Sequence, residues 1–256
     1  MLFKIKQALI QTSTSYEPKN WQRAVKYKYG LHPLSTVGSL GFIGGRFNTG
    51  AGVNPEVPFF SGLYLAQDKD TALQEHLGQE ASPDSKITPR ELALTNPASE
   101  TIVSVSGKLD KIFDLTNSDN LIPFVELIKK FKLSKELMVS ASKLSVVKPG
   151  IVQTAKSLLK TLLNPDWRAL PSNYDVPANS QIFGHLVYSS GIEGILYPSK
   201  FTKIPCLVIF PRNFVGTDSF IILDDDVPHP KVPCRLDASN WRISEMDAKE
   251  VMGVNT

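Results

Sequence analysis

Residues 41–79 read G-F-I-G-G-R-F-N-T-G-A-G-V-N-P-E-V-P-F-F-S-G-L-Y-L-A-Q-D-K-D-T-A-L-Q-E-H-L-G-Q. A glycine-dense turn in this stretch carries one arginine, Arg46, and a loop rich in glycine, asparagine and proline follows. Glycine at this density weakens regular structure, so it indicates places where the backbone approaches another group closely. An apolar strand at 61–66 then leads into a helix that carries Glu75. We interpret the stretch as the lining of a cleft for an anionic ligand whose chemistry develops positive charge.

The helix has a recognisable start. Asp68 or Asp70 precedes the apolar-periodic run T-A-L-Q-E-H-L, and a carboxylate in that place is a common N-terminal cap. Leu73 and Leu77 lie four residues apart and are expected to face the core. Glu75 falls off that stripe, so its carboxylate can point into an adjoining cleft.

Composition sets the class of protein. The chain has 256 residues, of which 42% are hydrophobic and 21% charged, as in ordinary soluble globular proteins. The net charge of +3 is small and the basic residues are scattered, so direct nucleic-acid binding is not expected. Cys206 and Cys234 lack the spacing of zinc ligands, which predicts no metal site and free thiols. A disulfide between these two cysteines is the open alternative.

The sequence also bears on location. The apolar pieces at the N-terminus are broken by Lys4 and Lys6, unlike a signal peptide. No stretch reaches the roughly 18 apolar residues of a membrane span. We therefore expect a cytoplasmic protein that does not enter the membrane, although export without a cleaved signal stays open.

The remaining pattern predicts an α+β fold, because strands and helices intermix without the regular alternation of a doubly wound sheet. We expect a single domain over 1–256, with a core at about 20–215 and a C-terminal tail at about 216–256. Strands are expected at 63–66, 101–105, 111–115, 194–198 and 205–210, with a turn at Gly107 between the second and third. A helix is expected at 180–190, and a helical insertion at about 117–163.

Other segments have weaker patterns. Residues 1–15 are interpreted as a short strand or a loose arm, and 17–29 as an amphipathic surface segment in which Asn20 caps a short helix. The polar, proline-containing stretch 79–100 is expected to be an extended surface insertion, and 165–177 a loop. The tail is expected to hold an edge strand followed by loose structure.

Several blocks, taken in order, resemble the RES domain, which is named for an arginine, a glutamate and a serine and is found as the toxin of Xre–RES toxin–antitoxin pairs. The blocks are G-G-R-F-N, L-Y-L-A, A-L-Q-E-H, D-L-T, D-W-R, G-I-L-Y-P-S and C-L-V-I-F-P, within residues 40–211. The resemblance implies a fold like that of ADP-ribosyltransferase toxins, with NAD as substrate and no other cofactor. Members of the family break the nicotinamide–ribose bond by hydrolysis or phosphorolysis, and some transfer ADP-ribose to a protein.

The resemblance also assigns residues. The family arginine falls on Arg46, the glutamate on Glu75, the serine on Ser199 and the tyrosine of L-Y-L-A on Tyr64. We expect Arg46, Glu75 and Tyr64 to be catalytic. The residues expected to bind substrate are Ser199, Gly45, Asn48 and Ser180. The insertions at 79–100 and 117–163 depart from the commoner family pattern and leave the mouth of the cleft undefined.

The chemistry explains these residue types. Breaking the bond between nicotinamide and ribose develops an oxocarbenium-like cation, which a fixed carboxylate such as that of Glu75 stabilises. The planar guanidinium of Arg46 can hold two phosphate oxygens at once. Tyr64 offers a ring for stacking. Trp167 and Arg168, in D-W-R, are expected to brace the fold rather than to act.

Three functions follow from this sequence. The first is an NAD-degrading toxin, the second an ADP-ribosyltransferase that modifies a protein or nucleic acid, and the third a nucleotide-binding module without turnover. Retention of Arg46, Glu75 and Ser199 counts against the third. No helix-turn-helix is recognisable, so an Xre-type antitoxin is expected to be a separate chain.

Overall fold

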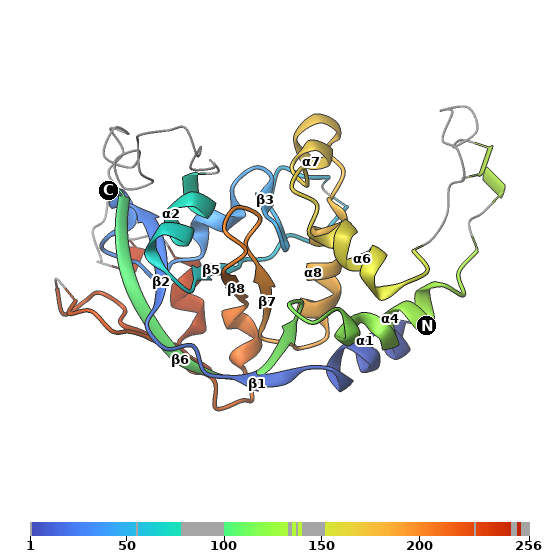
Figure 1. Ribbon diagram of the computed structural model, residues 1–256. Helices are drawn as coiled ribbons and strands as arrows, with labels where there is room; N and C mark the ends of the chain where they lie inside the picture. Colours follow the sequence, from blue (N-terminus) through green and yellow to red (C-terminus); the bar gives the residue numbers. More distant parts are fainter. Residues whose placement is uncertain are drawn as a thin grey trace.

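The computed structural model describes residues 2–54, 56–77, 100–132, 135–136, 138–139, 152–227, 229–246 and 250–251. These residues form an eight-stranded sheet with helices packed beside it, which confirms the expected α+β fold (Figure 1). The insertion expected at 79–100 lies outside the described residues except for Glu100. Among the helices of the described part, none is long and apolar enough to cross a membrane.

The sheet strands are β1 Thr14–Tyr16, β2 Trp21–Lys26, β5 Leu63–Ala66, β6 Glu100–Asp114, β7 Gly194–Pro198, β8 Pro205–Ile209, β9 Phe220–Leu223 and β10 Arg235–Asp237. A small hairpin consists of β3 Gly44–Gly45 and β4 Asn48–Thr49. The α-helices are α1 Leu2–Gln11, α2 Lys69–Leu77, α4 Ile122–Ile128, α6 Ala155–Leu162, α7 Ala169–Tyr174 and α8 Asn179–Ser189. The 3₁₀ helices are η1 Tyr27–Tyr29, η2 Val37–Leu40, η3 Ser118–Leu121, η4 Pro211–Phe214 and η5 Trp241–Glu245.

The long strand β6 organises the sheet. The strand order is β10-β9-β6-β2-β5-β8-β7, and β1 also pairs with β6. The first part of β6 pairs with β2, its middle with β9, and its last residues run parallel to β7. Figure 1 shows β6 as one curved strand along the sheet. Because β6 contacts both β2 and β7, the path β6-β2-β5-β8-β7 returns to its own start.

The prediction of two strands with a turn at Gly107 is wrong, because β6 is continuous from Glu100 to Asp114. Gly107 sits where β9 crosses closely: a Cβ at this position would lie 2.3 Å from the carbonyl oxygen of Phe220. The glycine therefore permits close approach of a neighbouring strand. That need is invisible in the local sequence, where glycine more often indicates a turn.

The N-terminal expectations also need correction. Residues 1–15 hold the helix α1 and the start of β1, and Ile5 and Leu9 on α1 are buried. The helix expected after Asn20 is instead the strand β2, and Asn20 itself has a positive φ of 54°. Pairing of β2 with β6 and β5 explains this outcome, since hydrogen bonds from distant strands override local helix propensity.

Two later segments are more ordered than expected. The presumed loop 165–177 contains the helix α7. In the tail, β9 lies between β10 and β6 and is therefore not an edge strand. Ile221 and Leu236 are fully buried there, and Thr36 donates hydrogen bonds from its backbone nitrogen and its hydroxyl to the carbonyl of Ser244. Contacts across more than 200 residues, rather than local pattern, order this tail.

Other predictions are confirmed. The helix at 180–190 corresponds to α8, and the strands at 194–198 and 205–210 to β7 and β8. Asp68 is the cap of α2, since its Oδ1 accepts from the backbone nitrogen of Thr71 at 2.8 Å. The described parts of 117–163 include η3, α4 and α6, so they are largely helical, whereas 133–134, 137 and 140–151 lie outside the described residues.

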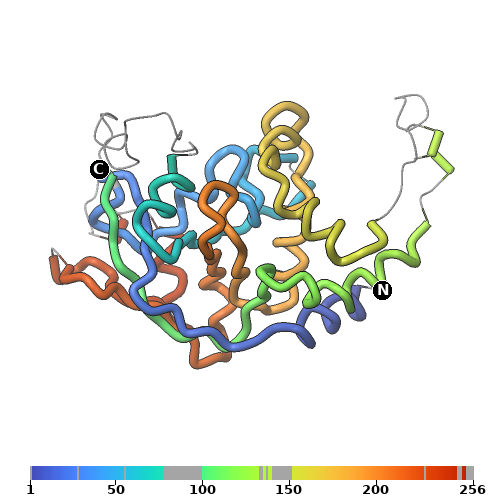
Figure 2. Tube along the Cα trace, in the orientation of Figure 1, coloured from blue at the N-terminus to red at the C-terminus, as the bar shows by residue number. Residues whose placement is uncertain are grey.

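The core consists of two apolar clusters. One joins α1, α4, α6 and α8 to the sheet, and the other joins β2, β6, β9 and β10 to η4. Figure 2 shows α1, α4 and α6 gathered on one side of the molecule, with the C-terminal strands on the other. The two cysteines are both free, Cys206 buried and Cys234 exposed, so the alternative of a disulfide is wrong.

Candidate active site

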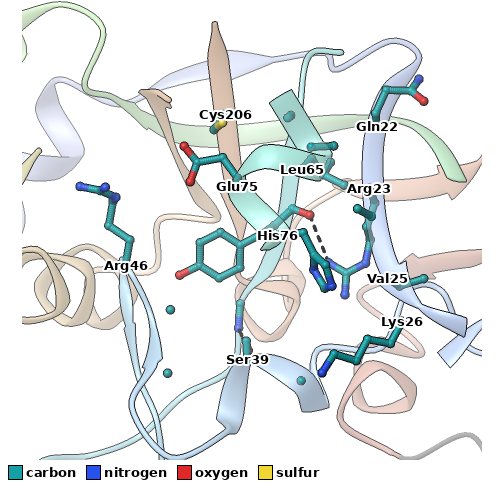
Figure 3. Close-up of a pocket in the computed structure, with 18 of the residues that line it drawn as sticks. Gln22, Arg23, Val25, Lys26, Ser39, Arg46, Leu65, Glu75, His76 and Cys206 are labelled. Carbon is teal, nitrogen blue, oxygen red and sulfur yellow. Dashed lines mark hydrogen bonds between the residues drawn. The ribbon is translucent and has the colours of Figure 1, made fainter. Parts of the chain in front are cut away.

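A cavity of about 350 Å³ is lined by residues from β2, β3, β5 and α2 and from the segment before α7. Four of the expected site residues line it: Arg46, Glu75, Tyr64 and Gly45. Figure 3 shows Arg46 and Glu75 reaching the same space from different elements. The fold therefore brings together the cation and the carboxylate that the sequence separates by a loop and a strand.

Arg46 lies in the turn between β3 and β4, and only 5% of its surface is exposed. Its Nη1 donates to the carbonyl oxygen of Asn164 at 3.1 Å. Its Nη2 is buried and has no hydrogen-bond partner among the described residues. Because buried donors in proteins are nearly always paired, an unpaired guanidinium nitrogen at a cavity points to a ligand acceptor.

The Arg46 turn is held by Gln181, a fully buried residue of α8. Its Nε2 lies within hydrogen-bond distance of three carbonyl oxygens, those of Ile43, Gly45 and Asn48. One amide thus satisfies several backbone acceptors that would otherwise be buried unpaired. Gln181 falls within the helix expected at 180–190, but its role in holding the turn was not predicted.

Tyr64, on β5, forms one wall of the cavity and contacts the Arg46 turn. Its hydroxyl donates to Oδ1 of Asn48 at 2.7 Å and accepts from the backbone nitrogen of Phe47 at 3.1 Å. Burial raises the pKa of Tyr64 well above its ordinary value, so the phenol is neutral. With the hydroxyl engaged twice, the ring is the part of Tyr64 available to a ligand.

The close approach of the Tyr64 side chain requires a glycine at position 45. A Cβ at Gly45 would lie 2.3 Å from the hydroxyl oxygen of Tyr64, far inside van der Waals contact. Its backbone nitrogen donates to Oδ1 of Asn48 at 3.1 Å. The Nδ2 of Asn48 donates to the carbonyls of Ser39 and Phe60. The amide oxygen and nitrogen of Asn48 therefore both form hydrogen bonds within the protein, and these bonds hold the cavity wall that Tyr64 forms.

Glu75 is fixed by a residue far along the chain. The hydroxyl of Ser199 donates to Oε1 of Glu75 at 2.6 Å, and the backbone nitrogen of Lys200 donates to the same oxygen at 3.1 Å. The Ser199 hydroxyl also accepts from the backbone nitrogens of Phe201 and Thr202. Hydrogen bonds to a carboxylate are among the stronger ones in proteins, so the orientation of Glu75 is well defined.

Three expected substrate-binding residues are not among the lining residues in the described part of the chain. Ser199 is 1% exposed and lies behind Glu75, and Asn48 is wholly buried in the wall. Ser180 is also 1% exposed, and its hydroxyl has no hydrogen-bond partner among the described residues. Their direct contact with a substrate stays a prediction. What the structure adds is that Ser199 orients Glu75.

Sequence reasoning missed two lining residues, Trp167 and Arg168. The Arg168 guanidinium carbon lies 4.7 Å from the centroid of the Trp167 ring, and that of Arg46 lies 6.0 Å from it. Burial and the charge of Arg46 lower the pKa of Arg168, and burial with both arginines lowers the pKa of Lys200. The block D-W-R was the available signal, but alone it does not show which way these side chains point.

The sequence also did not predict the lining residues at the other end of the cavity, Arg23 and His76. Arg23, on β2, donates to the carbonyls of Pro33, Ser35 and Tyr64, and burial lowers its pKa to about 10. Nearby, Nε2 of His76 lies 2.9 Å from a carboxylate oxygen of Glu100. Burial, together with the charges of Arg23 and Lys26, lowers the pKa of His76 to about 4, so its ring is neutral at pH 7.

The cavity lining also includes a thiol, that of Cys206. Cys206, on β8, is 1% exposed and reaches the cavity beside Glu75 (Figure 3). Burial raises the pKa of this thiol, with a further contribution from the charge of Glu75. Because the thiolate is the reactive form, Cys206 is suited to packing rather than to nucleophilic attack.

Comparison with known proteins identifies the class. The model of the RES domain matches residues 20–233, so the chain belongs to the RES domain family. Among solved structures, it is similar to a chain in the crystal structure of the M. tuberculosis MbcT–MbcA toxin–antitoxin complex. That match has a TM-score of 0.49 and 14% sequence identity, and it covers 94% of this chain and 97% of the other. No curated protein matches the sequence.

Proposed function

We propose that this chain is an NAD-degrading toxin that cleaves the bond between nicotinamide and ribose by hydrolysis or phosphorolysis. Membership of the RES domain family supports the substrate class. The observation that carries the proposal is the hydrogen bond from Ser199 to Glu75, which fixes a carboxylate in the cavity that Arg46 also lines. An orienting hydroxyl behind a carboxylate is the arrangement expected for electrostatic stabilisation of a developing cation.

In the proposed reaction, Arg46, Tyr64 and Glu75 each have one role. Arg46, which lines the cavity, binds the diphosphate through its guanidinium. The Tyr64 ring packs against the nicotinamide end. The carbon–nitrogen bond breaks with its electron pair moving to the nicotinamide nitrogen, so nicotinamide leaves neutral and the ribose carbon becomes cationic. Glu75 stabilises that cation until water or phosphate attacks it and loses a proton.

Incubation of the purified protein with NAD, with and without phosphate, tests the proposal. We expect nicotinamide to be released, and ADP-ribose or its phosphorylated form to accumulate according to the acceptor. Glu75→Gln is expected to lower the rate by on the order of 100-fold or more, since it removes the stabilising charge. Glu126→Gln is the matched control, because Glu126 forms an exposed ion pair with Lys129 at the end of α4 and does not line the cavity.

The result that would exclude the proposal is the absence of nicotinamide under every acceptor condition. ADP-ribosyl transfer to a macromolecule shares the same bond-breaking step. NAD labelled in its adenine would distinguish the two, since label retained in precipitated protein or nucleic acid would indicate transfer, and label in small products degradation.

We also propose a separate antitoxin chain of the Xre type and action in the cytoplasm, both supported by the RES family membership. Expression of the wild-type chain alone is expected to arrest bacterial growth and lower cellular NAD. The Glu75→Gln variant, expressed to the same level, is expected to do neither. Growth arrest by both proteins would separate toxicity from NAD cleavage.

A further inference from the structure

Arg168 provides a second guanidinium at the Arg46 end of the cavity. Both guanidinium carbons lie near one indole ring, that of Trp167, at 4.7 Å and 6.0 Å from its centroid. The sum of these distances limits the separation of the two carbons to 10.7 Å. Arg46 is buried, whereas Arg168 is exposed, so Arg168 is the more accessible of the two cations from solvent.

Within the described part of the chain, no carboxylate lies within salt-bridge distance of Arg46 or Arg168. Burial and the charge of Arg46 lower the pKa of Arg168, while the charge of Glu75 acts in the opposite direction. Holding like charges together at a partly enclosed surface is unfavourable unless an anion joins them. Nη2 of Arg46 also has no hydrogen-bond partner among the residues that the structure describes.

The protein holds both cations in place. The hydrogen bond from Arg46 to the carbonyl of Asn164 ties the Arg46 turn to the segment that carries Arg168. That segment turns tightly, since the backbone nitrogen of Asp166 donates to the side chain of Asn164 and that of Ala169 to the carbonyl of Asp166. Stacking on an aromatic face orients a guanidinium while leaving its in-plane N–H donors free.

We propose that Arg168 is a second phosphate-binding residue of this site, which holds the diphosphate of the dinucleotide from the solvent side while Arg46 holds it from inside. The identity of the ligand rests on the proposed function. The phosphate chemistry does not, because it follows from two guanidinium groups that line one cavity and that form no salt bridge within the described part of the chain. The Trp167 ring, which lies near both guanidinium groups, serves as their shared platform.

Calorimetric titration with ADP tests this inference without requiring turnover, because ADP has the diphosphate but no bond to nicotinamide. We expect Arg168→Gln to weaken ADP binding about 10- to 100-fold, since it removes charge-assisted hydrogen bonds. Adenosine, which has no phosphate, is expected to bind the variant and the wild type equally. With NAD, the same variant is expected to raise KM far more than it lowers kcat, because ground-state and transition-state binding are lost together.

Arg242→Gln is the matched control. Arg242 is also exposed and also stacks on a tryptophan, with its guanidinium carbon 5.1 Å from the Trp241 ring, but it does not line the cavity. This control is expected to bind ADP as the wild type does. If Arg168→Gln unfolds, as judged by circular dichroism, Arg168→Met retains the apolar contact with Trp167 and gives the same comparison.

Each outcome decides the inference. Equal ADP affinity of wild type and Arg168→Gln would overturn it, and so would a wild type that binds neither ADP nor inorganic phosphate. Loss of inorganic phosphate binding with unchanged ADP binding would overturn the diphosphate assignment and place Arg168 at the acceptor instead. Arg168-dependent ADP binding without nicotinamide release would support the inference while excluding the proposed function.

Discussion

Arg23 and Arg46 line opposite ends of one cavity, and their hydrogen bonds differ. The guanidinium of Arg23 donates to three backbone carbonyls and so joins β2, β5 and the loop before η2. The guanidinium of Arg46 has one carbonyl partner and one buried nitrogen without a partner in the described part of the chain. An arginine whose three nitrogens all donate to the backbone holds the fold, whereas one with an unpaired buried nitrogen is a candidate to bind a ligand.

The comparison also explains why the sequence distinguishes the two arginines poorly. Arg23 lies in a strand and Arg46 in a glycine-rich turn, but residue type and neighbours do not report how many donors are satisfied. The number of satisfied donors depends on carbonyl groups that lie far away in the sequence. Site-directed changes at the two ends should therefore separate stability from activity.

The largest expected effect is on stability, at the Arg23 end. Arg23→Met leaves the carbonyls of Pro33, Ser35 and Tyr64 without this donor. Since each buried unsatisfied group costs about 1–3 kcal/mol, we expect the free energy of unfolding to fall by roughly 3–5 kcal/mol. Urea unfolding followed by circular dichroism measures this. A loss below 1 kcal/mol would mean that water replaces the guanidinium and that Arg23 does not hold the fold.

At the other end, Arg46→Gln is expected to lower kcat/KM for NAD on the order of 100- to 1000-fold, since it removes the proposed charged contact with the diphosphate. The unfolding free energy should fall by only about 1 kcal/mol, the worth of the single hydrogen bond to Asn164. Rates of nicotinamide release and urea unfolding of the same preparation provide the two values. A variant as active as the wild type would remove Arg46 from the site.

A smaller effect is expected at Gly45, where the added methyl group of Gly45→Ala meets the hydroxyl of Tyr64. Overpacking of this kind typically costs about 1–3 kcal/mol. Tyr64→Phe in the same background should restore part of the loss, because it removes the oxygen nearest to the new methyl group. If the double variant is no more stable than Gly45→Ala alone, the clash lies elsewhere.

The smallest expected effect is on the pH dependence of stability, and it concerns His32, whose pKa is lowered by burial and by the charge of Arg23. His32 is fully buried, and burial together with the charge of Arg23 lowers its pKa. The unfolded state then binds a proton more readily than the folded state. The stability due to neutral His32 is therefore fully present above its ordinary pKa of about 6.5 and is lost as the pH falls through the window below that value.

Unfolding of His32→Asn by urea at pH 7 and pH 5 checks this sign. The wild type is expected to lose stability on acidification, and the variant to lose less. His76 and His185 also have lowered pKa values, so the variant should retain part of the dependence. An unchanged pH dependence in His32→Asn would assign the effect to these other histidines.

Much of the fold was readable from local pattern. The helix α2 with its Asp68 cap, the helix α8 and the strands β5, β7 and β8 follow from apolar spacing and capping residues. The parts that could not be read, β2 and the continuous β6, are stabilised by pairing with strands far along the chain. Hydrogen bonding between distant strands leaves no periodic signal within the segment itself.

For the site, the sequence by itself determined which residue types are present: an arginine in a glycine turn, a carboxylate on the next helix and a serine in a late loop, in the order of the RES family. Only the tertiary structure decided that Ser199 bonds to Glu75 across 124 positions and that Arg168 joins Arg46 at the cavity. The reason is physical. Side-chain chemistry is a local property of the chain, whereas pairing, burial and charge proximity depend on segments that meet only when the sheet closes.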